Sequence, residues 1–145
     1  MSIDRSDGPE PSTATLLSLA HLMLSRQVSE GVARAGHPIK ASHSAVFGQL
    51  GVHGARLSDL AKGANMTPQA MGELVDELEG LGYVLRQPDP SDRRAKLITL
   101  TESGRQCAAV GSDTIGEIER GITDALGERG HRALRKALRT LLEQS

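Results

Sequence analysis

The segment over residues 57–105 constrains the fold most, because several elements of different kinds follow one another there without long gaps. Thr67 and Pro68 predict a helix start, since a threonine hydroxyl caps the first backbone N–H groups and proline fits the first helical position. We expect this helix to end at Gly80 and Gly82. Its apolar residues recur at spacings of three and four: they are Met71, Leu74, Val75 and Leu78.

The elements on either side of this helix complete a small domain. A short helix capped by Ser58 precedes it, and Asn65 falls in the turn between the two helices, where a positive φ is tolerated. After it, residues 83–87 and 96–100 predict two strands joined by a polar loop over residues 88–95. This order predicts a helix-turn-helix followed by a β-hairpin wing, an arrangement that usually binds duplex DNA.

The remaining residues predict helices that flank this domain. Ser12 begins a helix that runs to about residue 34, Ser42 begins a short one, and Thr101 caps a long one to about residue 125. Gly127 and Gly130 separate a last helix from it. One Phe, one Tyr and no Trp leave an aliphatic core, so we expect a mainly α fold with a small hairpin.

Length and composition fit one soluble domain. The chain has 145 residues and a net charge of −1, so any attraction to nucleic acid must come from local patches. Residues 1–11 predict a disordered lead-in and residues 12–145 a single domain. Without an apolar run of about 18 residues or a signal core, we expect a cytoplasmic protein with no membrane contact. The only cysteine, Cys107, excludes an intrachain disulfide.

Three motifs resemble the MarR family of bacterial transcription regulators. Residues 57–61 read L-S-D-L-A, and residues 66–69 read M-T-P-Q, followed by L-V-D-E-L and G-Y-V. Residues 89–104 read D-P-S-D-R-R-A-K-L-I-T-L-T-E-S-G, which is the most specific of the three. Because the flanking helices fit the same architecture, the resemblance covers nearly everything after residue 12.

The resemblance implies a homodimeric winged helix-turn-helix with N- and C-terminal dimerisation helices. It places the winged helix-turn-helix at residues 42–100 and the interlocking dimerisation helices at residues 12–35 and 101–143. Its implied partners are a second copy of the chain, a pseudo-palindromic DNA operator and a small-molecule effector that releases a repressor. The sequence contains no motif typical of an enzyme, and we expect no cofactor.

Such a dimer would bury the apolar faces of the two predicted C-terminal helices. Packing of these faces inside one subunit fits the periodicity equally well, and only the resemblance favours the dimer. The residues are Ile115, Ile118, Ile122, Leu134, Leu138 and Leu141.

The first turns of the Thr67 helix are expected to enter the major groove. Gln69 matches adenine N6 and N7, and Glu73 matches the N4 amino group of cytosine, although nearby phosphates would repel it. Thr67 is a candidate phosphate contact if its hydroxyl is not fully used as the helix cap. The predicted groove-facing set is completed by Ala70 and Gly72.

The wing would place Arg93 or Arg94 in the minor groove, with Asp89 and Asp92 pairing with these arginines and shaping the loop. A solvated charged turn is the alternative interpretation. Further candidates for phosphate contacts are Arg86, Lys96, Ser42, His43 and Ser44, with capping favoured for Ser42.

The acidity of the predicted recognition helix departs from the family. Residues 67–80 carry four acidic and no basic residues, and residues 55–100 carry six basic and seven acidic ones. We therefore expect modest affinity and a shallow salt dependence. The alternative function is a winged-helix dimer that binds another protein through this helix.

An effector pocket is expected between the first two helices and the start of the Thr101 helix. His21, Leu24, Val28, His43 and Phe47 are the candidate lining residues. We expect Cys107 to be a buried, inert thiol rather than a peroxide sensor. The spacing of the histidines does not suggest a metal site.

Overall fold

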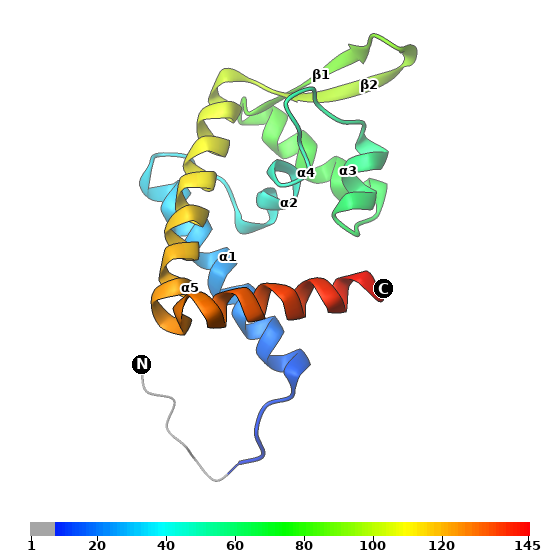
Figure 1. Cartoon of the computed structure of the whole chain (residues 1–145). Coiled ribbons are helices and arrows are strands. Elements are labelled where there is room, and N and C mark those ends of the chain that lie inside the picture. The colour runs from blue at the N-terminus through cyan, green and yellow to red at the C-terminus, as the bar shows by residue number, and fades with distance from the viewer. Residues whose placement is uncertain (1–7) are drawn as a thin grey trace.

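The computed structural model describes residues 8–145, so most of the predicted lead-in over residues 1–11 lies outside the described residues. The chain is mainly helical with one two-stranded antiparallel hairpin, as the sequence predicts (Figure 1). The elements in order are the helices α1 (Thr13–Arg34), η1 (Ala41–His43, a 3-10 helix), α2 (Ser44–Phe47), α3 (Leu57–Gly63) and α4 (Pro68–Gly80), the strands β1 (Val84–Asp89) and β2 (Asp92–Leu100), and the helix α5 (Glu102–Glu143).

Three predicted helix caps are confirmed. The hydroxyl groups of Ser12, Thr67 and Thr101 accept hydrogen bonds from the backbone N–H three residues later, at 3.1, 3.1 and 3.0 Å. Asn65 has the expected positive φ, 54°, in the turn between α3 and α4. Local sequence therefore fixes where α1, α4 and α5 begin.

Two other predicted helix starts are wrong. The N-cap of α3 is Arg56 rather than Ser58, and it makes no side-chain cap bond. The N-cap of η1 is Lys40 rather than Ser42, because the Nδ1 atom of His43 accepts the Lys40 backbone N–H at 3.0 Å. In the second case the ring of His43, the third residue of η1, bonds the backbone of the N-cap residue Lys40.

The wing is longer than predicted, and the expected loop over residues 88–95 is wrong. β1 extends to Asp89 and β2 begins at Asp92, with Val84 paired to Leu100 and Pro88 to Lys96. The outer part of the hairpin is mostly exposed. It therefore lacks the apolar–polar alternation by which a half-buried strand is recognised in a sequence.

The hydrophobic core lies in the winged helix-turn-helix and under the N-terminal part of α5. Each large aliphatic side chain that is fully buried there contributes about 1.5–3 kcal/mol. Tyr83 adds aromatic contacts, with ring centroids 5.6 Å from His37 and 6.2 Å from Phe47. The buried apolar side chains are Val32, Val46, Leu60, Ala61, Met71, Val75, Leu78, Tyr83, Val84, Ile98 and Cys107.

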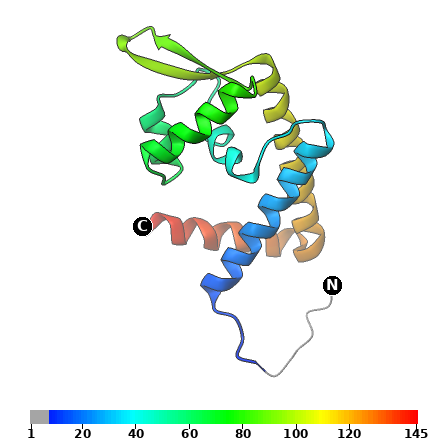
Figure 2. The same cartoon turned by 180° about the vertical axis from the view of Figure 1, so that it is seen from behind.

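The helix α5 changes direction at Gly127, where φ is 72° and the conformation is not helical. The break predicted at Gly127 is thus confirmed, whereas Gly130 lies inside the helix that follows. Both cartoon views show α1 beside α5, with the part of α5 after Gly127 running below the helix-turn-helix (Figures 1 and 2). Within residues 8–145, none of the helices has the length and apolarity needed to cross a membrane.

Candidate nucleic-acid interface

The first turns of α4 present Gln69 and Glu73 on the face opposite the core. Met71 and Val75, which are 0% exposed, turn inward. Gln69 and Glu73 lie four residues apart, so they project from one side of the helix, and both are exposed. The small residues Ala70 and Gly72 flank this side, together with the exposed Thr67. The structure therefore brings the predicted groove-facing residues onto one short surface.

The carboxylate of Glu77 joins α4 to the η1 segment instead of pointing outward. Its Oε2 atom lies 2.7 Å from His43 Nε2 and 3.3 Å from Lys40 Nζ. The hydrogen bond from His43, followed by that from Lys40, lowers the pKa of Glu77 below its usual value. His43 is only 1% exposed, and both its ring nitrogens are bonded within the chain. His43 is thus a structural residue, which corrects its assignment as a phosphate contact. It lines a hollow beside Lys40 and Glu77 rather than the cavity between α1, α2 and α5.

Two further carboxylates of α4 pair with the wing strand. The Arg86 guanidinium lies 2.7 Å from Asp76 Oδ1 and 3.1 Å from Glu79 Oε1. Arg86 was expected to contact a phosphate. In this structure its guanidinium fixes the orientation of β1 relative to α4, so it contributes little unpaired positive charge.

The distal end of β1, beside the hairpin turn, is attached to the start of α3 by an ion pair that the sequence did not reveal. Arg56 Nη2 lies 2.7 Å from Asp89 Oδ2, and Asp89 Oδ1 accepts bonds from the Ser91 backbone N–H at 2.9 Å and hydroxyl at 2.8 Å. The Ser91 bonds, followed by the Arg56 bond, lower the pKa of Asp89 to about 2. Asp89 raises the pKa of Arg56 in turn.

Asp89 was expected to pair with Arg93 or Arg94, and the structure corrects this by pairing it with Arg56. The two partners are 33 residues apart in the sequence, and no local motif connects them. Asp92 shapes the turn as predicted, because its Oδ1 atom accepts the Arg94 backbone N–H at 3.0 Å.

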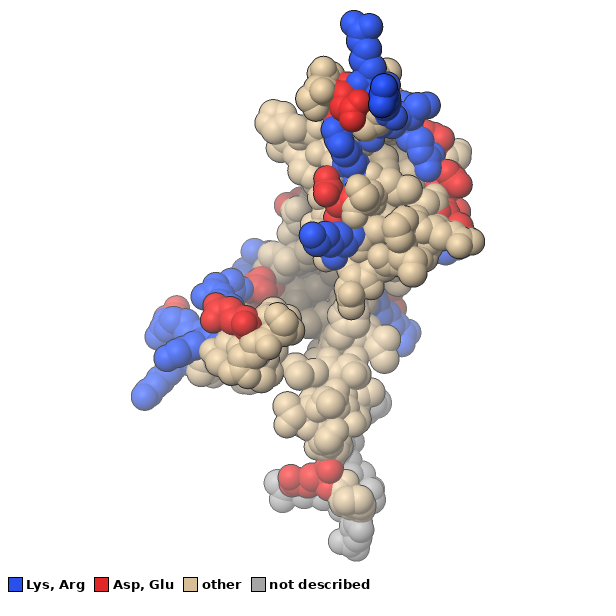
Figure 3. Space-filling view, turned by 90° about the vertical axis from the view of Figure 1, so that its right-hand side faces the viewer, with Lys and Arg blue, Asp and Glu red and all other residues tan. Residues whose placement is uncertain are grey.

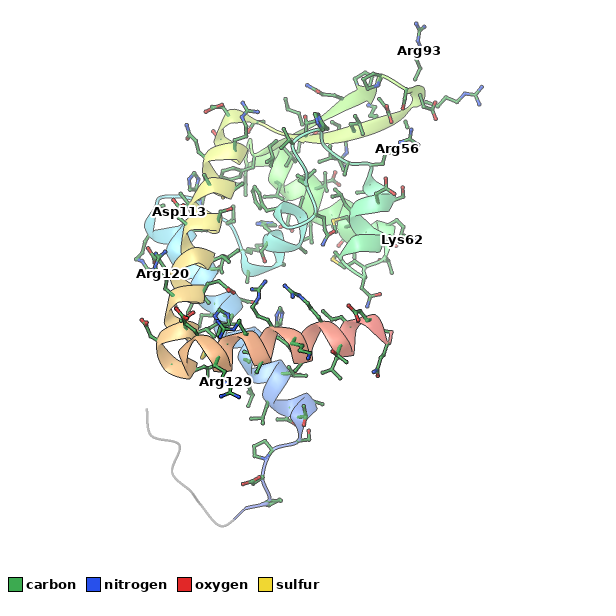
Figure 4. All side chains as sticks on the ribbon, in the orientation of Figure 1. Arg56, Lys62, Arg93, Asp113, Arg120 and Arg129 are labelled. Carbon is green, nitrogen blue, oxygen red and sulfur yellow. The ribbon has the colours of Figure 1, made fainter. Side chains whose placement is uncertain are left out.

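The outer wing carries exposed basic side chains. In the described part of the chain, Arg93, Arg94 and Lys96 make no ion pair with a carboxylate. Arg93 projects from the tip of the hairpin, away from the body of the molecule (Figure 4). A space-filling view shows Lys and Arg side chains gathered at this end (Figure 3).

The acidic balance of the linear sequence therefore overstates the negative charge available to a ligand. Of the four acidic residues of α4, Asp76, Glu77 and Glu79 have basic partners within the chain. Among residues 8–145, Glu73 is the acidic residue of α4 for which no ion pair is found. The charged side chains that this surface offers to a ligand are then Glu73, near the N-terminus of α4, and the arginines of the wing.

The predicted pocket residues do not line one common cavity. Val28 and Phe47 line an apolar cavity of about 280 Å³ between α1, α2 and α5, which Cys107 also lines. Leu24 lines a hollow between α1 and α5, and His21 lines another beside Ser42 and Ser44. Cys107 is 2% exposed, and burial raises the pKa of its thiol, in line with the predicted inert thiol.

The predicted dimerisation helices expose large apolar side chains. Ile115 is 50% exposed and Leu141 52%, whereas Ile118, Ile122 and Leu138 are half-buried and Leu134 is 38% exposed. The N-terminal half of α1 adds more exposed apolar surface: it includes Leu16, Leu17, Leu19, Leu22 and Met23.

Comparison with known proteins agrees with this architecture. Residues 52–96 match the model of the MarR family. The chain is 37% identical over 65 residues to the transcriptional activatory protein BadR of Rhodopseudomonas palustris, and the match spans 42% of this chain and 37% of that protein. The chain therefore aligns with well under half the length of this curated relative.

Solved structures give the same fold. The Staphylococcus aureus MepR–DNA complex matches 94% of this chain and 100% of the MepR chain, with a TM-score of 0.78 and 20% identity. The repressor CouR bound to a 23-mer DNA duplex matches 90% of this chain and 92% of its own, with a TM-score of 0.73 and 24% identity. These likenesses confirm the fold.

Proposed function

We propose that this chain, which carries the winged helix-turn-helix of the MarR family, is a homodimeric, sequence-specific DNA-binding regulator. The observation that carries the proposal is the distribution of charge: the acidic residues of α4 beyond Glu73 are paired inside the chain, while Arg93 and Arg94 extend from the wing. The start of α4, with Gln69 facing outward, can enter the major groove and hydrogen-bond to base edges. The exposed arginines of the wing can enter the adjacent minor groove, where the potential is negative.

The homodimer is supported by the apolar surface of α1 and α5. Leu16, Leu19 and Met23 lie three and four residues apart and are 54%, 55% and 56% exposed. A monomeric protein rarely exposes such an apolar stripe to water, and a two-fold symmetric dimer would bury the stripe of both subunits. A dimer also places two recognition helices on one duplex, which matches a pseudo-palindromic operator.

We further propose that the regulator is a repressor from which a small molecule releases DNA. The apolar cavity of about 280 Å³ lies between α1, α2 and α5, where the dimerisation helices meet the winged helix-turn-helix. A ligand that fits only one relative arrangement of these elements would shift the protein towards that arrangement. Val28 and Phe47 are the predicted residues that line it.

The test is an anisotropy titration of the purified protein with duplex DNA from upstream of its own coding region, at low and near-physiological salt. We expect saturable binding that survives competitor DNA, and loss of most of it in the double variant Arg93→Ala, Arg94→Ala. The matched control, Arg120→Ala with Arg129→Ala, removes the same charge from α5 far from the wing (Figure 4).

Unchanged affinity of the wing variant would refute the wing contact. A folded dimer that binds no DNA even at low salt would refute the proposal as a whole. Pull-downs for a protein partner of α4 would then follow.

A further inference from the structure

We propose that Glu73 is a specificity-determining residue, which selects a cytosine in the major groove by accepting a hydrogen bond from its N4 amino group. The inference rests on the proposed DNA-binding function and adds which base one half-site must contain. It starts from the different surroundings of the four acidic residues of α4.

Three of these residues have structural roles that explain their charge. Glu77 bonds His43 at 2.7 Å, and Asp76 and Glu79 both bond Arg86. Glu73 has no such partner among the described residues, and it is exposed. Within residues 8–145 its carboxylate makes no ion pair or hydrogen bond, so it is available to a partner outside the chain.

An unpaired carboxylate on this surface costs affinity unless the DNA offers it a donor. Phosphates repel it, guanine and thymine present only acceptors in the major groove, and adenine presents its N6 donor beside the N7 acceptor. Cytosine presents only the N4 amino donor there, which makes it the base that a carboxylate matches best. Thymine presents the O4 acceptor at the equivalent position and would be repelled.

The neighbouring glycine supports close approach at this point. Gly72 lies inside α4, where glycine is less favourable than alanine by about 0.5–1 kcal/mol. A Cβ added at Gly72 would meet only Leu57 Cδ2 at 3.7 Å, which is an ordinary contact. Packing inside the chain therefore does not require glycine here. A bare backbone next to Glu73 instead leaves room for a groove wall.

Gln69 provides the second reading position. It projects from the same side as Glu73, one helical turn closer to the α4 N-terminus. A glutamine amide matches adenine, so the pair predicts neighbouring adenine and cytosine contacts in each half-site.

The experiment is a selection from a pool of duplexes with a randomised central region, using the full chain and reading the bound fraction by sequencing. Three proteins are compared: wild type, Glu73→Gln, and Asp113→Asn, which removes one exposed acidic charge from α5 away from the wing (Figure 4). The selected duplex is then titrated with its cytosine–guanine pair intact or replaced by thymine–adenine.

We expect wild type and Asp113→Asn to select a motif with one invariant cytosine per half-site. The change to thymine should weaken their binding about 5- to 150-fold, the range for one good base contact. The Glu73→Gln variant should lose most of this discrimination, because an amide also donates to thymine O4.

A motif with the same base preferences in wild type and Glu73→Gln would overturn the inference while leaving the proposed DNA binding intact. A uniform gain of affinity of Glu73→Gln for all duplexes would overturn it equally. Failure of the wild type to select any motif would instead refute the proposed function itself.

Discussion

Replacing Gly72 by alanine should make the protein more stable and a weaker DNA binder. The residue is helical, has no positive φ, and leaves space for a methyl group 3.7 Å from Leu57 Cδ2. Alanine restricts the unfolded chain and suits a helix, which stabilises the fold by about 0.5–1 kcal/mol. For a chain of this size, that corresponds to a rise in melting temperature of about 2–4 °C.

The same methyl group would lie on the flank of α4 that faces Leu57, next to Glu73 and at the edge of the surface that we expect to approach the groove. Overpacking of a close contact costs about 1–3 kcal/mol, so the affinity for the selected duplex should fall at least about fivefold. Thermal melting by circular dichroism and anisotropy titration measure the two effects on the same protein preparation.

The control variant is Gly121→Ala in α5. A Cβ at Gly121 meets nothing within 4 Å, so a similar stabilisation is expected there without a change in DNA affinity. Stabilisation of Gly72→Ala with unchanged affinity would refute the close approach of α4 to DNA. A lower melting temperature would refute the assignment of Gly72 as structurally dispensable.

Three further outcomes are expected. The double variant Leu19→Glu, Met23→Glu should raise the dissociation constant of the dimer, measured by sedimentation, about a thousandfold. Each of the two side chains is just over half exposed, and burying that half contributes about 1 kcal/mol in each of the two subunits. Leu85→Glu, on an exposed wing residue, should leave the dimer intact, and equal dissociation of both variants would contradict the assigned interface. His43→Ala should lower the free energy of unfolding in urea by about 1–3 kcal/mol, because it removes a buried bonding partner of Lys40 and Glu77; an unchanged free energy of unfolding would mean that water replaces the hydrogen bonds of the ring. The folded pKa of Asp89 is lowered to about 2. The contribution of its carboxylate to the free energy of unfolding should therefore be fully present above a pH of about 4 and vanish as the pH falls through about 2. Wild type and Asp89→Asn should differ in stability at neutral pH and become equally stable in strong acid.

Local chemistry decided which parts of this structure could be predicted from the sequence. Thr67 and Thr101 were correctly placed as caps, since a cap bond spans three residues and the apolar spacing that follows confirms it. The same rule failed at Ser42 and Ser58, because capping serines and ordinary helical serines differ only in their surroundings. His43 could not be foreseen as the residue that completes the start of η1.

The electrostatics of the site could not be predicted for a related reason. Glu77 meets His43 from 34 residues away, and Asp89 meets Arg56 from 33 residues away. When charges are only counted along the sequence, Glu77, Asp89 and Arg56 all count as charges without a partner. Only the packing of α4 against η1, and of the wing against α3, shows that Glu77 has a hydrogen-bond partner in His43 and that Asp89 has an ion-pair partner in Arg56.

The paired carboxylates change how the acidity of α4, the proposed recognition helix, is to be understood. Asp76 and Glu79 hold Arg86 of β1, and Glu77 holds the η1 segment, so the charges that weaken attraction to phosphates also fix α4 relative to the wing. A helix held in this way has few orientations available and depends less on the phosphate backbone for its affinity. The log of its binding constant should therefore fall slowly with the log of the salt concentration, with a slope set mainly by Arg93 and Arg94. Discrimination between bases would then come from Gln69 and Glu73.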